Sequence, residues 1–115
     1  MDEAAFQRGL ELFNKGEFFD AHEVLEDVWR AAPAGEKKFL QGLIQVAVGL
    51  HHHSRGNLAG ARSLLARANR NLSMYPARHG GIELEALRTE VGLWVRTLEG
   101  GGGTPALPRI ERNWG

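Results

Sequence analysis

A chain of 115 residues with 43% hydrophobic and 24% charged residues has the composition of one soluble globular domain, not of a disordered or membrane-spanning protein. Its lack of cysteine excludes disulfides, thiolate catalysis and sulfur-ligated zinc, so a metal ion would need His, Asp or Glu ligands. The formal net charge is zero. Because the N-terminus has no secretory-signal pattern and the longest apolar run is too short for a bilayer, we expect a cytoplasmic location without membrane contact.

Five amphipathic stretches, separated by turn signals, predict an all-α fold. Asp2 can cap a first helix, which ends near the sequence NKGE. The second stretch covers residues 18–31, and the third, 36–54, is apolar around most of its circumference, which predicts a central position. The fourth covers residues 58–74, a YPARHGG loop follows, and the fifth covers residues 83–99. No segment alternates with period two for long enough to predict a strand.

The C-terminal end has a different composition from the helical part. Residues 1–99 are expected to form one helical domain, and residues 100–115 a Gly- and Pro-rich tail. The tail contains Leu107, Ile110 and Trp114, which are many large apolar residues for a disordered end. The sequence leaves open whether the tail docks along the bundle or is frayed.

An internal repeat links the first four helices. The sequence GEFFDAHEVLEDV from Gly16 aligns without a gap with GNLAGARSLLARA from Gly56, at an offset of 40 residues (56 − 16). The shared turn glycine, small alanine and leucine resemble tetratricopeptide helices, although the period exceeds the usual length of about 34 residues. Two repeats are too few for an extended solenoid. The sequence therefore predicts two related helical hairpins and a fifth helix in a compact, tetratricopeptide-like bundle.

The second helix carries polar side chains beside the stripe that it must bury. His22 lies at the edge of that stripe, and Glu26 lies one turn further along the same side. The segment HEVLE differs from the zinc-protease pattern H-E-x-x-H by a glutamate in place of the second histidine. His22 and Glu26 are therefore candidate ligands of a divalent metal ion, with Glu23 as a candidate general base for a metal-bound water.

The third helix has polar residues in apolar surroundings. Gln41, Gln45 and His52 fall within about 40° of one another on a helical projection. A buried amide or imidazole without a partner costs about 1–3 kcal/mol, so we expect these groups to meet His22 and Glu26 inside the bundle. The predicted pocket then consists of metal ligands His22, Glu26 and His52, catalytic Glu23, and lining residues Trp29, Gln41, Gln45 and Asn57. Trp29 also suits packing, and Asn57 also suits a helix cap.

Three functions fit these features. The first is a metal-dependent hydrolase that uses the pocket. The second is a non-catalytic helical-hairpin interaction module, in which His22 and Glu26 only satisfy a polar network. The third is binding of phosphate or nucleic acid by a segment that contains no acid between residues 51 and 82. Its candidate residues are Arg55, Arg62, Arg67 and Arg70. The zero net charge and the lack of interleaved aromatic residues disfavour nucleic acid.

The sequence names neither a substrate nor a partner. Whether the partner is a small molecule or another protein stays open. Leu93 and Trp94 on the fifth helix are a candidate contact for a homodimer.

Two segments taken together resemble a known family. FNKGEFFDAHEVLEDVWR and FLQGLIQVAVGLHHHSRGNLAGA, with the spacing between them, resemble the small all-helical bacterial proteins called domain of unknown function 309, over about residues 13–72. Some members of that family are labelled predicted metal-dependent hydrolases, so the resemblance implies a metal-binding pocket. The positions that carry the resemblance are His22, Glu23, Glu26, Trp29, Gln41, Gly42, Gln45, His52 and Asn57. The tail lies outside it.

Overall fold

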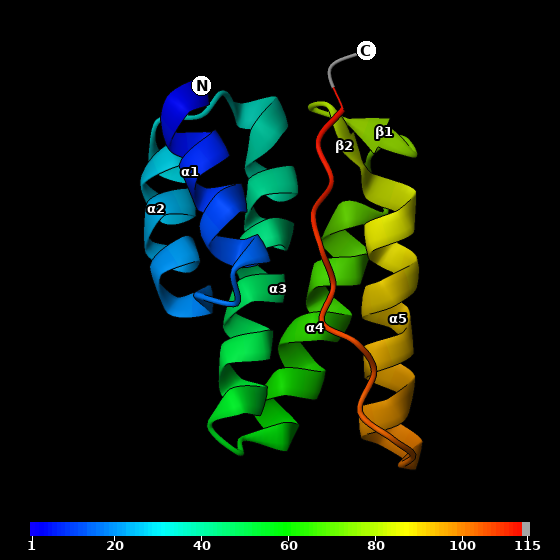
Figure 1. The fold of residues 1–115 in the computed structure, drawn as a ribbon. Coiled ribbons are helices and arrows are strands. Elements are labelled where there is room, and N and C mark those ends of the chain that lie inside the picture. Colours follow the sequence, from blue (N-terminus) through cyan, green and yellow to red (C-terminus); the bar gives the residue numbers. More distant parts are fainter. Residues whose placement is uncertain (114–115) are drawn as a thin grey trace.

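The computed structural model describes residues 1–113. Its helices are α1 (Glu3–Asn14), α2 (Phe18–Arg30), α3 (Lys37–Ser54), α4 (Leu58–Leu72) and α5 (Leu84–Gly100) (Figure 1). A short 3-10 helix, Ala34–Glu36, precedes α3, and two strands, β1 (Arg78–His79) and β2 (Ile82–Glu83), separate α4 from α5. The predicted all-α, five-helix bundle is confirmed.

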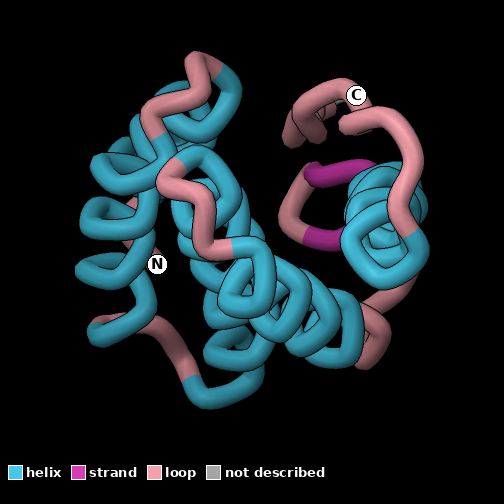
Figure 2. Tube along the Cα trace, turned by 90° about the horizontal axis from the view of Figure 1, so that it is seen from below, coloured by secondary structure: helices cyan, strands magenta, loops and turns pink. Residues whose placement is uncertain are grey.

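The helices form two consecutive hairpins with α3 in the centre. α1 packs on α2, α2 on α3, α3 on α4, and α4 on α5. Figure 2 shows that α5, the two strands and the C-terminal segment lie together on one side of the other helices. Because α3 has a helix on both sides, eight of its residues are buried, as the apolar circumference of this helix predicted.

Each hairpin turns at a glycine with the same backbone conformation. Gly16 and Gly56, 40 residues apart, have φ values of +79° and +80°. Glycine adopts this left-handed region without the steric cost that a Cβ atom imposes. The alignment of the two turn glycines in the repeat thus corresponds to one shared turn geometry.

A second pair of glycines extends the repeat into the first helix of each hairpin. A Cβ atom added to Gly9 would lie 2.7 Å from Cδ2 of Leu25, and one added to Gly49 would lie 2.9 Å from Cδ2 of Leu65. Both distances are too short for real carbon contacts. In each hairpin, the missing side chain therefore lets a leucine of the second helix pack onto the backbone of the first.

The short β-hairpin was not predicted. Arg78 pairs with Glu83 and His79 with Ile82 in antiparallel register. The two-residue turn, Gly80 and Gly81, has positive φ at both positions (+58° and +76°). Two-residue hairpin turns of this kind favour Gly-Gly, but strands of two residues are too short to show alternation. The glycine pair was the only signal in the sequence.

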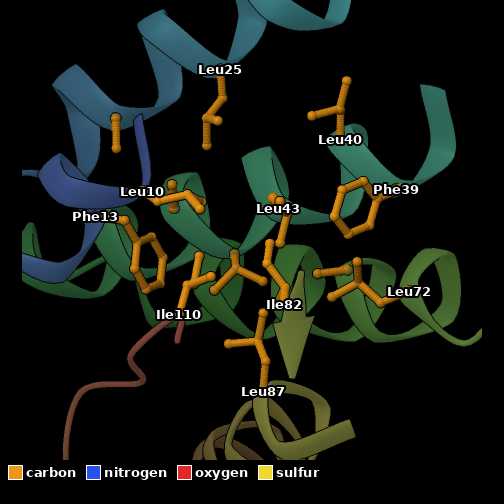
Figure 3. Close-up of a cluster of buried hydrophobic side chains, with 14 of the residues drawn as sticks. Leu10, Phe13, Leu25, Phe39, Leu40, Leu43, Leu72, Ile82, Leu87 and Ile110 are labelled. Carbon is orange, nitrogen blue, oxygen red and sulfur yellow. The ribbon is translucent and has the colours of Figure 1, made fainter. Parts of the chain in front are cut away.

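The C-terminal segment packs along the bundle. Ile110 is 2% exposed and belongs to the same apolar cluster as Phe13, Leu43 and Leu87 (Figure 3). Ile82 forms an isolated bridge with Arg112, so the segment also extends the hairpin. Trp114 lies outside the described residues.

The close contact between the two helices of the second hairpin can be tested with Gly49→Ala. We expect this change to lower the free energy of unfolding by roughly 1 kcal/mol or more, because overpacking costs about 1–3 kcal/mol and the gain in helix propensity is at most about 1 kcal/mol. Gly35→Ala is the control, since nothing lies within 4 Å of its added Cβ atom. Urea denaturation followed by circular dichroism measures both. A Gly49→Ala protein that is more stable than wild type would contradict this packing.

Candidate functional site

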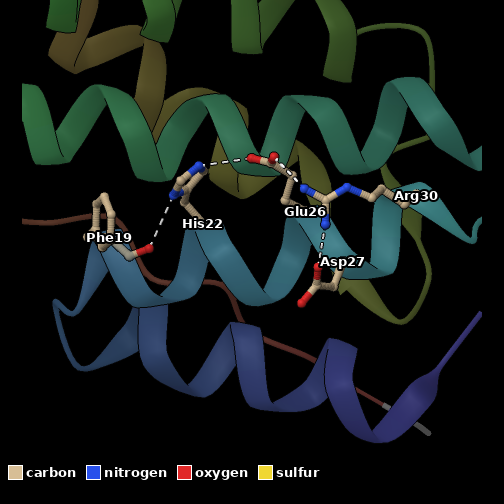
Figure 4. A network of polar contacts seen from close by, with 5 residues as sticks. All are labelled: Phe19, His22, Glu26, Asp27 and Arg30. Carbon is tan, nitrogen blue, oxygen red and sulfur yellow. Dashed lines mark hydrogen bonds and ion pairs between the residues drawn. The ribbon is translucent and has the colours of Figure 1, made fainter.

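The predicted residues of α2 form a chain of polar contacts beside α3 (Figure 4). Nε2 of His22 lies 2.9 Å from Oε2 of Glu26, one turn along the helix. Oε1 of Glu26 accepts a hydrogen bond from Nη2 of Arg30 at 3.1 Å, and Arg30 also pairs with Asp27. On its other side, Nδ1 of His22 donates to the carbonyl oxygen of Phe19 at 3.2 Å. The side chains of His22 and Glu26 are both partly exposed.

Both ring nitrogens of His22 have oxygen partners within the chain. Nδ1 contacts the carbonyl oxygen of Phe19, and Nε2 contacts the carboxylate of Glu26. Metal ligation uses the lone pair of a deprotonated ring nitrogen, so an ion would compete with one of these partners. A metal ion on Nε2 would have to break the contact with Glu26, whose other oxygen is held by Arg30.

His52 does not join His22 and Glu26. Its Nδ1 atom lies 3.5 Å from Nδ2 of Asn57. Asn57 in turn caps α4, because its Oδ1 atom accepts from the backbone N–H of Gly60 at 2.9 Å. Within residues 1–113, no three or more His, Asp or Glu side chains come together in a way that could hold a metal ion. The residues present do not fit the three-ligand centre expected from His22, Glu26 and His52.

Gln45 also faces away from α2. Its Oε1 atom accepts a hydrogen bond from Nδ2 of Asn71 on α4 at 2.8 Å. His52, two turns further along α3, shares this side and meets the residue that caps α4. Periodicity showed that Gln45 and His52 share a face, but it could not show which neighbouring helix that face meets. No polar or charged residue in the described part of the chain is fully buried, so the buried network expected around these groups is a partly exposed one.

The side of α3 that does meet α2 carries Gln41 from the predicted stripe together with residues that were not predicted. A shallow cavity of about 250 Å³ has walls from both helices, formed by Glu26, Trp29, Gln41 and Ile44. Nearer the start of α2 and the end of α3, the ring centroids of Phe19 and His51 are 5.5 Å apart. His51 is thus the histidine that faces α2, one residue and about 100° away from the predicted His52. Phe19, Ile44 and His51 were not predicted as site residues, although Phe19 and Ile44 are apolar residues at the margin of the buried side of their helices.

We call this surface the α2–α3 face. It consists of Phe19, His22, Glu26 and Trp29 from α2 and Gln41, Ile44 and His51 from α3. The side chain of Phe19 is 51% exposed. The Nε1 atom of Trp29 is buried and has no hydrogen-bond partner. Lys37 lies 4.4 Å from the centroid of the Trp29 ring.

Acidic groups border the α2–α3 face on the outer side of α2. Besides Arg30, that helix carries four carboxylates, from Asp20, Glu23, Glu26 and Asp27. A second shallow cavity, of about 160 Å³, is lined by His22, Glu23, Glu26, Asp27 and Arg30. Glu23 therefore lies at the rim of the face and is exposed to solvent. Its predicted role as general base depends on a metal-bound water that the surrounding residues are not arranged to hold.

The other predicted surfaces are only partly available. Trp94 is buried, and its indole N–H donates to the carbonyl oxygen of Ala106 at 2.9 Å. A homodimer contact through Leu93 and Trp94 would therefore involve Leu93 alone.

The four arginines considered for phosphate binding are all exposed, and Arg62 lies 3.5 Å from Glu99. In the described part of the chain, no helix combines the length and the apolar character that crossing a membrane requires.

Comparison with known proteins identifies relatives without a described activity. Residues 6–64, about half of the chain, match the family described as Domain of unknown function (DUF309). An uncharacterized protein named YpuF from Bacillus subtilis is 41% identical over 68 residues, which are 58% of this chain and 37% of YpuF. An uncharacterized protein from Aquifex aeolicus is 35% identical over 77 residues, 66% of this chain and 23% of the relative. The alignments thus span well under half of each relative. The family match includes all of the α2–α3 face.

The metal prediction can be tested by equilibrium dialysis against zinc and manganese. We expect no stoichiometric uptake by the wild-type protein, and no difference between wild type and His22→Ala, because within residues 1–113 no group of three His, Asp or Glu side chains is arranged to hold an ion. His53→Ala controls for adventitious binding by the three consecutive histidines. Retention of one ion per chain that is lost in both His22→Ala and His52→Ala, but kept in His53→Ala, would contradict the separation of these side chains.

Proposed function

Because the chain belongs to the DUF309 family, whose description assigns no activity, we propose a function from the α2–α3 face. We infer that the domain is a helical-hairpin interaction module that binds a basic segment of a partner protein along this face. The observation that carries the proposal is the combination of exposed aromatic and apolar side chains with an acidic border on one pair of packed helices.

The apolar part of the face supports binding to a protein segment. Phe19 is half-exposed on a helix whose other large apolar residues are largely covered, and it lies between the rings of His22 and His51 at centroid distances of 5.5 Å. Trp29 and Ile44 line the cavity between α2 and α3. Aromatic side chains at the centre of a contact surface commonly contribute the largest share of binding energy.

The acidic border supports a basic partner. The four carboxylates of α2 are opposed within that helix by Arg30 alone. An excess of one charge on a surface attracts partners of the opposite charge and raises their rate of association. Asp20 and Glu23 are exposed, and so they are available to lysine or arginine side chains of a bound segment.

The lengths of the relatives are consistent with a module. The aligned region makes up 37% of one relative and 23% of the other. A compact unit that occupies only part of a longer chain is typical of a domain with its own hydrophobic core. A metal-dependent hydrolase is the weaker proposal, because the three candidate ligands belong to two separate surfaces.

The proposal is tested by selecting binders from a displayed library of random peptides on the immobilised protein. We expect the selected peptides to be enriched in lysine and arginine, and the affinity of the best one, measured by fluorescence anisotropy, to fall by roughly 3- to 10-fold in Glu23→Lys, the range of a rim charge. Glu11→Lys is the matched control, since it makes the same charge change at an exposed position of α1. Phe19→Ala should weaken binding by roughly 10-fold or more, as for an aromatic anchor.

Three results would contradict the proposal. They are a selection without basic peptides, equal loss of affinity in Glu23→Lys and Glu11→Lys, and binding that is unaffected by Phe19→Ala. Equal loss in the two charge variants would indicate unspecific attraction to the whole molecule.

A further inference from the structure

A second surface, on the other side of α1 from α2, already holds a peptide: the C-terminal segment of the chain itself. Four consecutive glycines, 100–103, separate this segment from the body of α5, and Gly101 and Gly102 have φ values of +85° and +109°. From Pro105 to Asn113 the chain is extended and runs between α1 and α5 to the β-hairpin (Figure 1). Pro108 and Ile110 are buried, whereas Leu107, Arg109 and Glu111 are exposed, which is the alternation of a strand with one face covered.

The groove holds the backbone of this segment through side chains. Oδ1 of Asn14 accepts from the N–H of Ile110 at 2.8 Å, and Nδ2 of Asn14 donates to the carbonyl oxygen of Ile110 at 3.0 Å. From α5, Trp94 donates to the carbonyl oxygen of Ala106 at 2.9 Å, and Oε2 of Glu90 accepts from the N–H of Arg109 at 3.3 Å. These contacts suit any extended chain, because they do not depend on its side chains.

The β-hairpin continues the same type of recognition. The N–H of Asn113 donates to the carbonyl oxygen of Gly81 at 2.6 Å, and the N–H of Glu83 donates to that of Glu111 at 3.3 Å. The segment thus adds to the hairpin as a further strand, which is a common way for a protein to bind an extended peptide.

Two positions of the segment supply selectivity. Ile110 enters the apolar cluster that also contains Phe13 and Leu87 (Figure 3). Two residues later, the side chain of Arg112 is only 5% exposed. Its guanidinium group lies 2.7 Å from Glu3 and 3.1 Å from Gln7, and 4.7 Å above the ring of Phe6. The surface therefore fits an aliphatic residue, which enters the apolar cluster, followed two positions later by an arginine, which contacts Glu3, Gln7 and Phe6.

We propose that the surface formed by α1, α5 and the β-hairpin is a binding site for an extended peptide with the pattern aliphatic-x-Arg, and that the C-terminal segment is its tethered competitor. The occupant that displaces the segment is a partner protein with this pattern and additional contacts. A second copy of the chain gains nothing by exchanging segments, because exchange preserves the contacts and adds the entropic cost of association. A short flexible tether gives the segment an effective concentration in the millimolar range, so a free peptide competes only when the tether is cut.

The test uses the full chain with a specific protease site in place of the glycines at 101–103. The protein is cleaved in its folded state, and a fluorescent synthetic peptide of residues 104–115 is added. We expect cleaved protein to keep its helical circular dichroism and to bind the peptide one-to-one with a dissociation constant in the micromolar range. Uncleaved protein should bind about 100-fold more weakly, because its own segment occupies the site.

Peptide and protein variants distinguish this site from unspecific binding. Ile110→Ser and Arg112→Ala in the peptide should each weaken binding by about 10-fold or more. Leu107→Ser is the matched control, since Leu107 is 53% exposed, and it should leave the affinity unchanged. Asn14→Ala in the cleaved protein should weaken binding of every peptide. The proposal is overturned if cleaved protein unfolds, fails to exchange its segment, forms dimers by segment exchange, or binds no better than uncleaved protein.

Discussion

The close packing of one leucine onto one glycine in each hairpin is the contact on which the arrangement of helices depends. Leu25 lies on the backbone at Gly9, and Leu65 lies on the backbone at Gly49. These contacts bring the two helices of each hairpin close together, and α3 packs against α2 and against α4. The α2–α3 face and the groove for the C-terminal segment are the surfaces that remain once these hairpins are packed.

Much of the fold could be predicted from the sequence because it depends on local patterns. Apolar periodicity located the helices, and the alignment of Gly16 with Gly56 identified two related hairpins. The β-hairpin could not be predicted, because its strands are shorter than the window in which alternation is visible. The position of the C-terminal segment depends on contacts between residues about 95 to 109 positions apart, such as those of Ile110 with Asn14 and Arg112 with Glu3, which periodicity does not register.

The candidate site was predicted in part. The contact between His22 and Glu26 follows from their spacing of four residues on one helix, and the structure contains it. The proposed meeting of these residues with Gln45 and His52 required a choice between two neighbours of α3. Gln45 and His52 contact Asn71 of α4 and the residue that caps α4, whereas Ile44 and His51 lie on the side of α3 that meets α2. Gln41 lies at the boundary, because it shares the predicted stripe but lines the cavity with Glu26. The predicted polar stripe is thus divided between the two neighbours of α3.

The direction of the polar stripe of α3 is the central claim, and it can be measured by nuclear Overhauser effects from the side-chain amide of Gln45 in labelled protein. Cross-peaks to the side chain of Asn71 on α4, without cross-peaks to α2, are the predicted result. Cross-peaks from that amide to the ring of His22 or the methylene protons of Glu26 would contradict the account, because they would place amide, imidazole and carboxylate in one shared pocket.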